Sequence, residues 1–123
     1  MSRDDRRIAH ARRHLDEGEL VLASALGREI GGRRGRVVLV SDRRVIIAWT
    51  RPEPADDLPL QTCTARYDSA ERILTITDAG RSIQVRDVEP VAARPVVECI
   101  TSIAGPPLAE RLGPAFKVRI VGA

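Results

Sequence analysis

The stretch that decides the fold is RVVLVSDRRVIIAWT, residues 36–50. It contains two runs rich in β-branched residues, 36–40 and 45–50, joined by the polar tetrapeptide Ser-Asp-Arg-Arg. Such runs favour strands, and a short polar connection between them favours a tight antiparallel hairpin. Residues 37–40 and 45–48 are apolar at every position, so we expect both faces of this hairpin to be covered.

More strands are predicted on either side of the hairpin. Residues 73–77 and 82–86 alternate apolar and polar side chains around the turn Asp-Ala-Gly-Arg, in which Gly80 can adopt a positive φ. Residues 19–24 indicate a strand before a Gly/Arg loop at 27–35, and residues 58–67 indicate another, with Pro59 near its start. The sequence therefore predicts a mainly β protein.

Two segments have helical periodicity. Residues 2–17 carry a thin apolar stripe of Ile8, Ala11 and Leu15 and end at Gly18. A second helix is expected to start at Pro95, a residue suited to a first turn, and to end at Gly105. Its apolar stripe consists of Val96, Cys99, Ile100 and Ile103.

The predicted organisation is an N-terminal helical segment (1–18), a β-domain with its helix (19–105) and a C-terminal extension (106–123). Within the extension, residues 108–112 can form one further helical turn. Residues 115–121, AFKVRIV, fit either a last strand or a tail that orders only against a partner.

Composition is that of one globular domain of 123 residues, with 43% hydrophobic and 30% charged residues. The only aromatic residues are Trp49, Tyr67 and Phe116. We therefore expect an aliphatic core and few stacking platforms for single-stranded nucleic acid. Lys117 is the only lysine among 20 basic residues, a bias that we attribute to a GC-rich genome.

The net charge of +3 is unevenly distributed. Residues 1–50 carry eleven arginines against seven acidic residues, whereas residues 51–123 carry nine basic against ten acidic residues. Attraction to an anionic partner is thus expected from the first half.

The sequence shows no signal-peptide pattern and no apolar run long enough for a membrane span, and Cys63 and Cys99 lack metal-like spacing. We expect a soluble cytoplasmic protein with two buried thiols.

Three short motifs carry a resemblance to a known family. Residues 15–22 (LDEGELVL), 38–47 (VLVSDRRVII) and 58–60 (LPL) resemble the first strand, the hairpin and a later strand opening of bacterial pleckstrin-homology-like (PH-like) and GRAM-like domains. The resemblance covers about residues 15–104. In this sequence Ser41 stands where Thr is usual and Ile47 where an aromatic residue is common.

The resemblance implies a PH-like barrel of six to seven antiparallel strands. Two bent sheets would pack nearly orthogonally, a C-terminal helix would cap one open end, and a further helix would precede the strands. It implies no cofactor.

The resemblance also suggests a ligand site, because in PH domains that bind inositol phospholipids the loop after the first strand holds the headgroup. Here that loop offers Arg28, Arg33, Arg34 and Arg36, with Arg43 expected to assist. Guanidinium groups are planar donors for phosphate or carboxylate, and the loop glycines allow close approach of an anion to the backbone. The alternative is a solvated hairpin loop without a ligand.

Other candidate residues favour structural roles. We expect Asp42 to cap the hairpin turn through its side chain, and one of Arg43 and Arg44 to pair across the strands. His10 and His14 are spaced as half of a metal site, but the arginines between them would repel a cation, so no metal is predicted. The arginines of residues 3–13 suit a solvated helix or an anionic surface. No nucleophile or acid–base constellation is visible, so no catalysis is predicted.

The favoured function is a non-enzymatic binding or scaffold module for a protein partner or an anionic lipid headgroup. One alternative is salt-sensitive, nonspecific nucleic-acid binding through the arginine-rich first half. Another is a structural role in which residues 115–121 add a strand to a neighbouring chain and produce a homo-oligomer.

Overall fold

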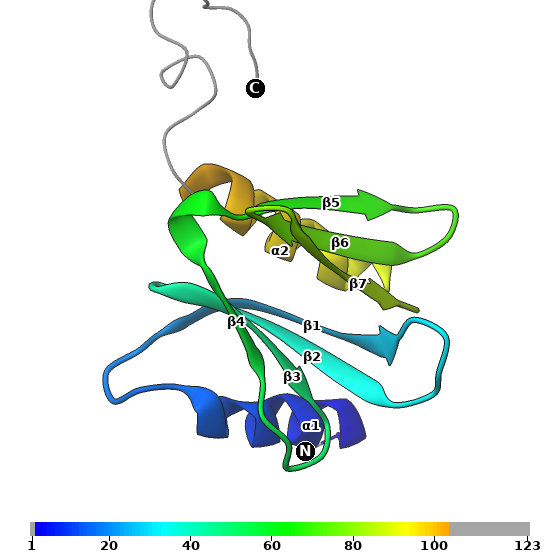
Figure 1. The fold of residues 1–123 in the computed structure, drawn as a ribbon. Coiled ribbons are helices and arrows are strands. Elements are labelled where there is room, and N and C mark those ends of the chain that lie inside the picture. Colours follow the sequence, from blue (N-terminus) through cyan, green and yellow to red (C-terminus); the bar gives the residue numbers. More distant parts are fainter. Residues whose placement is uncertain (1, 104–123) are drawn as a thin grey trace, which may run out of the picture.

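The computed structural model describes residues 2–103, which form one antiparallel sheet and two α-helices (Figure 1). The N-terminal helix α1 (Arg3–Ala11) continues as the short 3-10 helix η1 (Arg12–His14), and the last described element is α2 (Pro90–Ile103). Between these helices come β1 (Val21–Glu29), β2 (Gly35–Ser41), β3 (Arg44–Trp49), β4 (Asp56–Pro59), the 3-10 helix η2 (Leu60–Thr62), β5 (Thr64–Asp68), β6 (Ile73–Asp78) and β7 (Arg81–Arg86). The predicted mainly β architecture with a helix at each end is confirmed.

The seven strands lie in the order β4-β3-β2-β1-β7-β6-β5. Strand β1 pairs along its length with β2, but it pairs with β7 only through Arg28 opposite Arg86 and Glu29 opposite Val85. The half formed by β5–β7 consequently turns away from the half formed by β1–β4 and lies above it (Figure 1). Strands β4 and β5 end the sheet without a further strand partner in residues 2–103, so the sheet is not closed into a barrel by strand pairing.

Gly27 makes the junction between the two halves possible. A Cβ atom at this position would lie 2.6 Å from the Arg86 carbonyl oxygen and 2.5 Å from a methyl carbon of Val85. Any larger residue would therefore push β7 away from β1.

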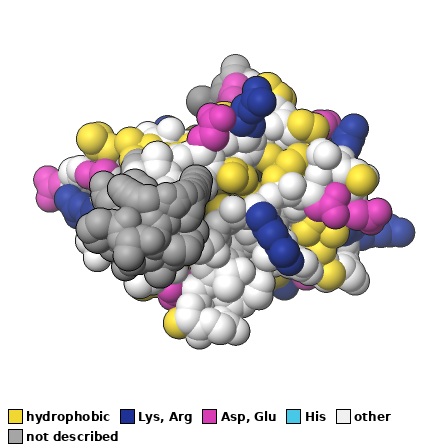
Figure 2. All heavy atoms as spheres, turned by 90° about the horizontal axis from the view of Figure 1, so that it is seen from above, with side chains coloured by type: hydrophobic (Ala, Val, Ile, Leu, Met, Phe, Trp, Pro, Cys, Tyr) yellow, Lys and Arg dark blue, Asp and Glu magenta, His cyan; other side chains and the backbone are white. Residues whose placement is uncertain are grey.

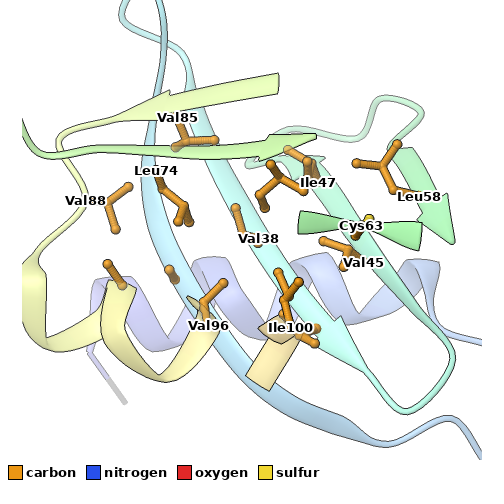
Figure 3. Close-up of a cluster of buried hydrophobic side chains, with 14 of the residues drawn as sticks. Val38, Val45, Ile47, Leu58, Cys63, Leu74, Val85, Val88, Val96 and Ile100 are labelled. Atoms are coloured by element: carbon orange, nitrogen blue, oxygen red, sulfur yellow. The ribbon is translucent and has the colours of Figure 1, made fainter. Parts of the chain in front are cut away.

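The main core lies between the two halves of the sheet and α2. Val38 and Ile47 from the first half, Val85 from the second, and Ile100 from α2 point toward one another (Figure 3). The predicted segment is helical, and Val96 and Ile100 of its apolar stripe are fully buried in the main core. The helix begins at Pro90 rather than Pro95, because Pro90 takes the first-turn position that we had assigned to Pro95.

A second core covers the opposite face of β2 and β3. Val37, Leu39, Ile46 and Ala48 are buried there beneath the N-terminal helix, which contributes the fully buried Ala11. Figure 1 places α1 on the side of β1–β4 that faces away from β5–β7. The expectation that both faces of this hairpin are covered is therefore confirmed, and α1 is what covers the second face.

Three element boundaries differ from the sequence prediction. Helical structure at the N-terminus ends at His14 instead of residue 17, because Leu15 is extended and leads the chain toward β1. Strand β1 runs to Glu29, so Gly27 and Arg28 are strand residues rather than loop residues. The single strand predicted at 58–67 is interrupted by η2, where the chain passes from the edge of one half of the sheet to the edge of the other.

The hairpin predicted at residues 73–86 is confirmed. Strands β6 and β7 pair from Leu74 opposite Val85 to Asp78 opposite Arg81. Ala79 and Gly80 form its turn with φ values of +48° and +81°, the left-handed conformation that a tight hairpin turn requires. The predicted C-terminal extension, residues 106–123, lies outside the described residues.

Candidate functional site

The structure brings together four of the five arginines proposed from sequence. Arg28 at the end of β1, Arg33 and Arg34 in the following turn, and Arg36 on β2 all lie at one end of the β1–β2 hairpin. Arg43 lies in the β2–β3 turn, at the other end of a seven-residue strand. Because a strand advances about 3.3 Å per residue, Arg43 is separated from the other four by roughly 20 Å.

Trp49 is the centre of the site at the first of these ends. It stands opposite Arg36 in the β2–β3 ladder. The guanidinium carbon of Arg36 lies 3.8 Å from the centre of the Trp49 ring, and that of Arg34 lies 4.1 Å from it. Both distances are typical of cation–π contacts. We call the group Arg34, Arg36, Trp49, Glu53, Asp56 and Arg81 the Trp49 corner.

Two carboxylates partly neutralise the three arginines of the Trp49 corner. Glu53 pairs with Arg34, and Asp56 accepts hydrogen bonds from both Arg36 and Arg81. Since Asp56 belongs to β4 and Arg81 to β7, their ion pair joins the two halves of the sheet by side chains. The corner retains one positive charge in excess.

Arg36 has an unused donor inside the protein. Its side chain is only 8% exposed, and its Nη2 donates to the Ile47 carbonyl at 3.0 Å and to Asp56 at 3.1 Å. Among residues 2–103, the buried Nε–H has no acceptor. Because a buried donor without a partner costs on the order of 1–3 kcal/mol, this atom is a natural point for an incoming acceptor to bind.

A hollow of about 350 Å³ opens beside Arg36 and Trp49. Its other walls are Glu29 and Ile30 at the end of β1, and Ser82, Ile83 and Gln84 on β7. Within the described part of the chain, residues 81–84 of β7 have no strand partner on the side next to β1, because the β1–β7 pairing stops at Val85. The hollow thus combines a cation, apolar side chains and an unpaired strand edge.

The turn that bounds the hollow is fixed by hydrogen bonds. Arg86 donates from Nε to the Glu29 carbonyl at 2.9 Å and from Nη2 to the Gly32 carbonyl. The Glu29 carboxylate accepts the Arg34 backbone N–H at 3.2 Å. Within this turn the Gly32 carbonyl and the Arg34 N–H thus bond within the protein, whereas Arg28 and Arg33 are exposed.

Sequence reasoning found Arg34 and Arg36 but missed Trp49, Glu53, Asp56 and Arg81. A signal for Trp49 was present: a turn centred between residues 42 and 43 places residue 36 opposite residue 49. Asp56 and Arg81 offered no comparable signal, because their contact depends on how β7 crosses toward β4.

The opposite end of the hairpin has a structural role. Glu19, whose side chain is fully buried, pairs with Arg44 and lies next to the Ser41 hydroxyl. The hydrogen bonds from Arg44, and then that from Ser41, lower the pKa of Glu19 to about 2 although burial acts in the other direction. Arg44 is thus the arginine that pairs across the strands, as expected for one of the two.

The predicted turn cap at Asp42 is wrong. The Ser41 hydroxyl accepts the backbone N–H groups of Arg43 and Arg44, each at 3.0 Å, and so fills that role. Asp42 instead accepts the Leu20 backbone N–H through its side chain and donates its own N–H to the Leu20 carbonyl. These two bonds tie residue 20 to residue 42 next to the pair of Val21 and Ser41, at which β1 begins.

The cysteines and histidines form no further site in residues 2–103. Burial raises the pKa of Cys63 to about 11, with the Asp78 charge adding to the effect, and burial also raises the pKa of Cys99. Burial lowers the pKa of His14, and the charge of Arg13 lowers it further. Within the described part of the chain, no three His, Cys, Asp or Glu side chains are placed to hold a metal ion. No helix there is long and apolar enough to cross a membrane.

Charge on the β5–β7 side is mixed. Figure 2 shows hydrophobic, basic and acidic side chains interspersed over this face, without a continuous basic stripe.

Comparisons with family models, with curated proteins and with solved structures found no match for this chain.

Proposed function

We propose that this chain is a non-catalytic binding module of the PH-like kind and that it docks a protein partner at the Trp49 corner. The observation that carries the proposal is the side chain of Arg36, which lines an open hollow and whose buried Nε–H lacks an acceptor within residues 2–103. A carboxylate of the partner would accept this hydrogen bond. A charge-assisted bond of this type contributes roughly 1.5–3 kcal/mol.

The surroundings of Arg36 favour a protein over a phospholipid headgroup. A headgroup with several phosphates needs several unpaired cations, but Arg34, Arg36 and Arg81 already pair with carboxylates. Glu29 also lines the hollow and would repel a polyanion. What the hollow can accept is one negative group.

Apolar surface beside that charge strengthens the case for a protein partner. Ile30 is 48% exposed at the rim, and Ile83 and the half-buried Trp49 lie next to it. An acidic side chain flanked by an apolar one would match this combination. The unpaired edge of β7 at residues 81–84 offers main-chain hydrogen bonds to an extended segment of the partner.

Two further parts of the proposal concern the fold family, which rests on the sequence resemblance, and the location of the protein. The bent seven-stranded sheet with α2 against its opening is compatible with a PH-like barrel, whose closure would be completed by side-chain contacts such as Arg81 with Asp56. We also propose a cytoplasmic location, since reduced cysteines are the normal state there.

Peptide selection tests the proposal directly. A display library of random peptides is selected on the immobilised full chain, and enriched peptides are titrated into the protein while fluorescence is recorded. Trp49 is the only tryptophan, so the signal reports on the corner itself. We expect enriched peptides to share Asp or Glu beside an apolar residue and to change the Trp49 emission.

Ile30 provides a matched pair of variants for the same titration. Ile30→Gln and Ile30→Glu remove the same apolar surface and differ only in charge. We expect the Glu variant to bind the peptides at least about tenfold more weakly than the Gln variant, because its carboxylate competes for Arg36 and repels an acidic ligand. Equal affinities would contradict the proposal.

Vesicles and oligonucleotides distinguish the competing partners. Binding to vesicles containing phosphatidylinositol phosphates that is lost in Arg28→Glu/Arg33→Glu, without any selected peptide, would replace the protein partner by a membrane. Binding to a single-stranded oligonucleotide that falls steeply with salt would favour nucleic acid instead. Arg43→Ala serves as the control, since Arg43 lies away from the corner and should leave peptide binding unchanged.

A further inference from the structure

A second hollow, on a different face from the Trp49 corner, lies between α2 and β5. Its volume is about 820 Å³, and its walls include Tyr67 on β5 and Pro90, Val91, Pro95 and Val97 on α2. Val91 is 83% exposed, so this hollow presents uncovered aliphatic surface on a helix that otherwise packs on a core. The Tyr67 hydroxyl donates to the Val88 carbonyl at 2.5 Å and so fixes the start of α2 beside β5.

The strand beside this groove has an unpaired edge. Strand β5 pairs with β6 on one side and ends the sheet on the other within residues 2–103. Its Ala65 and Tyr67 pack against the main core, whereas Thr64, Arg66 and Asp68 are exposed. An added strand would therefore have one side toward the groove and α2 and the other toward solvent.

We propose that residues 115–121 of the same chain occupy this groove as an eighth strand alongside β5. The segment AFKVRIV alternates in the way that such a position needs. Phe116, Val118 and Ile120 fall on one side of an extended chain and would cover Val91, while Lys117 and Arg119 fall on the other side. The segment lies outside the described residues, and its sequence is what matches the groove.

Chain length allows this contact within one molecule. Helix α2 ends at Ile103, and residues 104–114 connect it to the proposed strand. Eleven residues span up to about 36 Å when extended, whereas the fourteen residues of α2 cover about 21 Å. The connection can thus return past the whole helix to Val91. A tethered segment has an effective concentration near the millimolar range, which favours it over a second copy at micromolar protein concentration.

Hydrogen–deuterium exchange of the full chain tests the inference. Val118→Asn places a polar group on the side predicted to face α2, and Lys117→Asn places the same residue on the opposite side. In wild type and Lys117→Asn we expect slow exchange in peptides covering residues 64–69 and 90–98. In Val118→Asn we expect exchange on the order of tenfold faster there, because the added strand is released.

Two results would overturn the inference. Equal exchange rates in all three proteins would show that residue 118 does not cover the groove. Protection that rises with protein concentration, together with a dimer mass by light scattering, would show that the occupant is a second copy. Neither result bears on the Trp49 corner, whose peptide titration uses a different face, so the two proposals can fail separately.

Discussion

Glu19 and Arg44 form a bidentate ion pair at one end of the β2–β3 hairpin. Arg44 donates from Nε to one carboxylate oxygen of Glu19 at 3.0 Å and from Nη2 to the other at 2.9 Å. A third bond from Arg44 reaches the His14 carbonyl at 2.8 Å. One guanidinium thus ties the end of the N-terminal helical segment to the hairpin on which it packs.

This pair predicts the response to acid. The pKa of Glu19 is about 2 in the folded protein against an ordinary value of 4.5, so the unfolded chain binds the proton more readily. The stabilisation is complete above pH 4.5 and is lost as the pH falls toward 2. We expect the free energy of unfolding, measured with urea between pH 7 and pH 2, to decrease over this window. In Glu19→Gln the decrease should be smaller, and an unchanged pH profile in that variant would contradict the assignment.

At pH 7 the same substitution should destabilise the protein. Glu19→Gln leaves the charge of Arg44 without its buried partner, and we expect a loss of about 2–4 kcal/mol. Asp57 also pairs with Arg44, but its side chain is 51% exposed. Asp57→Asn should therefore cost less than about 1 kcal/mol. Equal losses in the two variants would be inconsistent with the burial of Glu19.

Gly27 predicts a packing effect at the junction of the two half-sheets. A methyl group there would overlap the Arg86 carbonyl, which belongs to the backbone and cannot rotate away. We expect Gly27→Ala to cost at least about 3 kcal/mol, at the upper end of overpacking effects. Gly80→Ala has open space around it but a positive φ, so backbone strain alone should cost about 1–2 kcal/mol. Thermal melts that rank the two variants in the reverse order would refute this account of the junction.

The position of α2 is tested by two neighbouring residues. Ile100 is fully buried in the main core, and the adjacent Thr101 is exposed. Ile100→Asp places a carboxylate among aliphatic side chains and should cost more than about 4 kcal/mol, enough to unfold the domain. Thr101→Asp should change stability by less than about 1 kcal/mol. A melting temperature of Ile100→Asp within a degree or two of wild type would show that α2 does not cap the core.

Much of the fold was predictable because local patterns and tertiary packing agree. The alternation in residues 73–86 and the doubly apolar hairpin at 36–50 each specify their own pairing, and both form as expected. The interruption between β4 and β5 was not predictable, because residues 58–67 look like one strand in the sequence. Residues 58–67 include the polar side chains of Gln61, Thr62, Thr64 and Arg66, and the break results from the passage of the chain between two half-sheets, which is a long-range property.

The candidate site shows the same limit. Clustering of Arg34 and Arg36 follows from their nearness in sequence, whereas their ion pairs depend on residues 19 and 20 positions away. The sequence therefore indicated an arginine-rich, anion-seeking loop, and the structure shows that Arg34 and Arg36 of this loop are already paired with carboxylates. The unpartnered Nε–H of Arg36 could be recognised only once Asp56 and Ile47 had been placed around it.

Arg36 itself provides the most direct test of the proposed function. The measurement is the NMR resonance of the Arg36 side-chain Nε–H in the full chain, recorded before and after saturation with a selected acidic peptide. We predict a downfield shift and slower exchange with water, as this donor gains a carboxylate acceptor. A peptide that saturates the protein while the Arg36 resonance stays unchanged would contradict docking at the Trp49 corner.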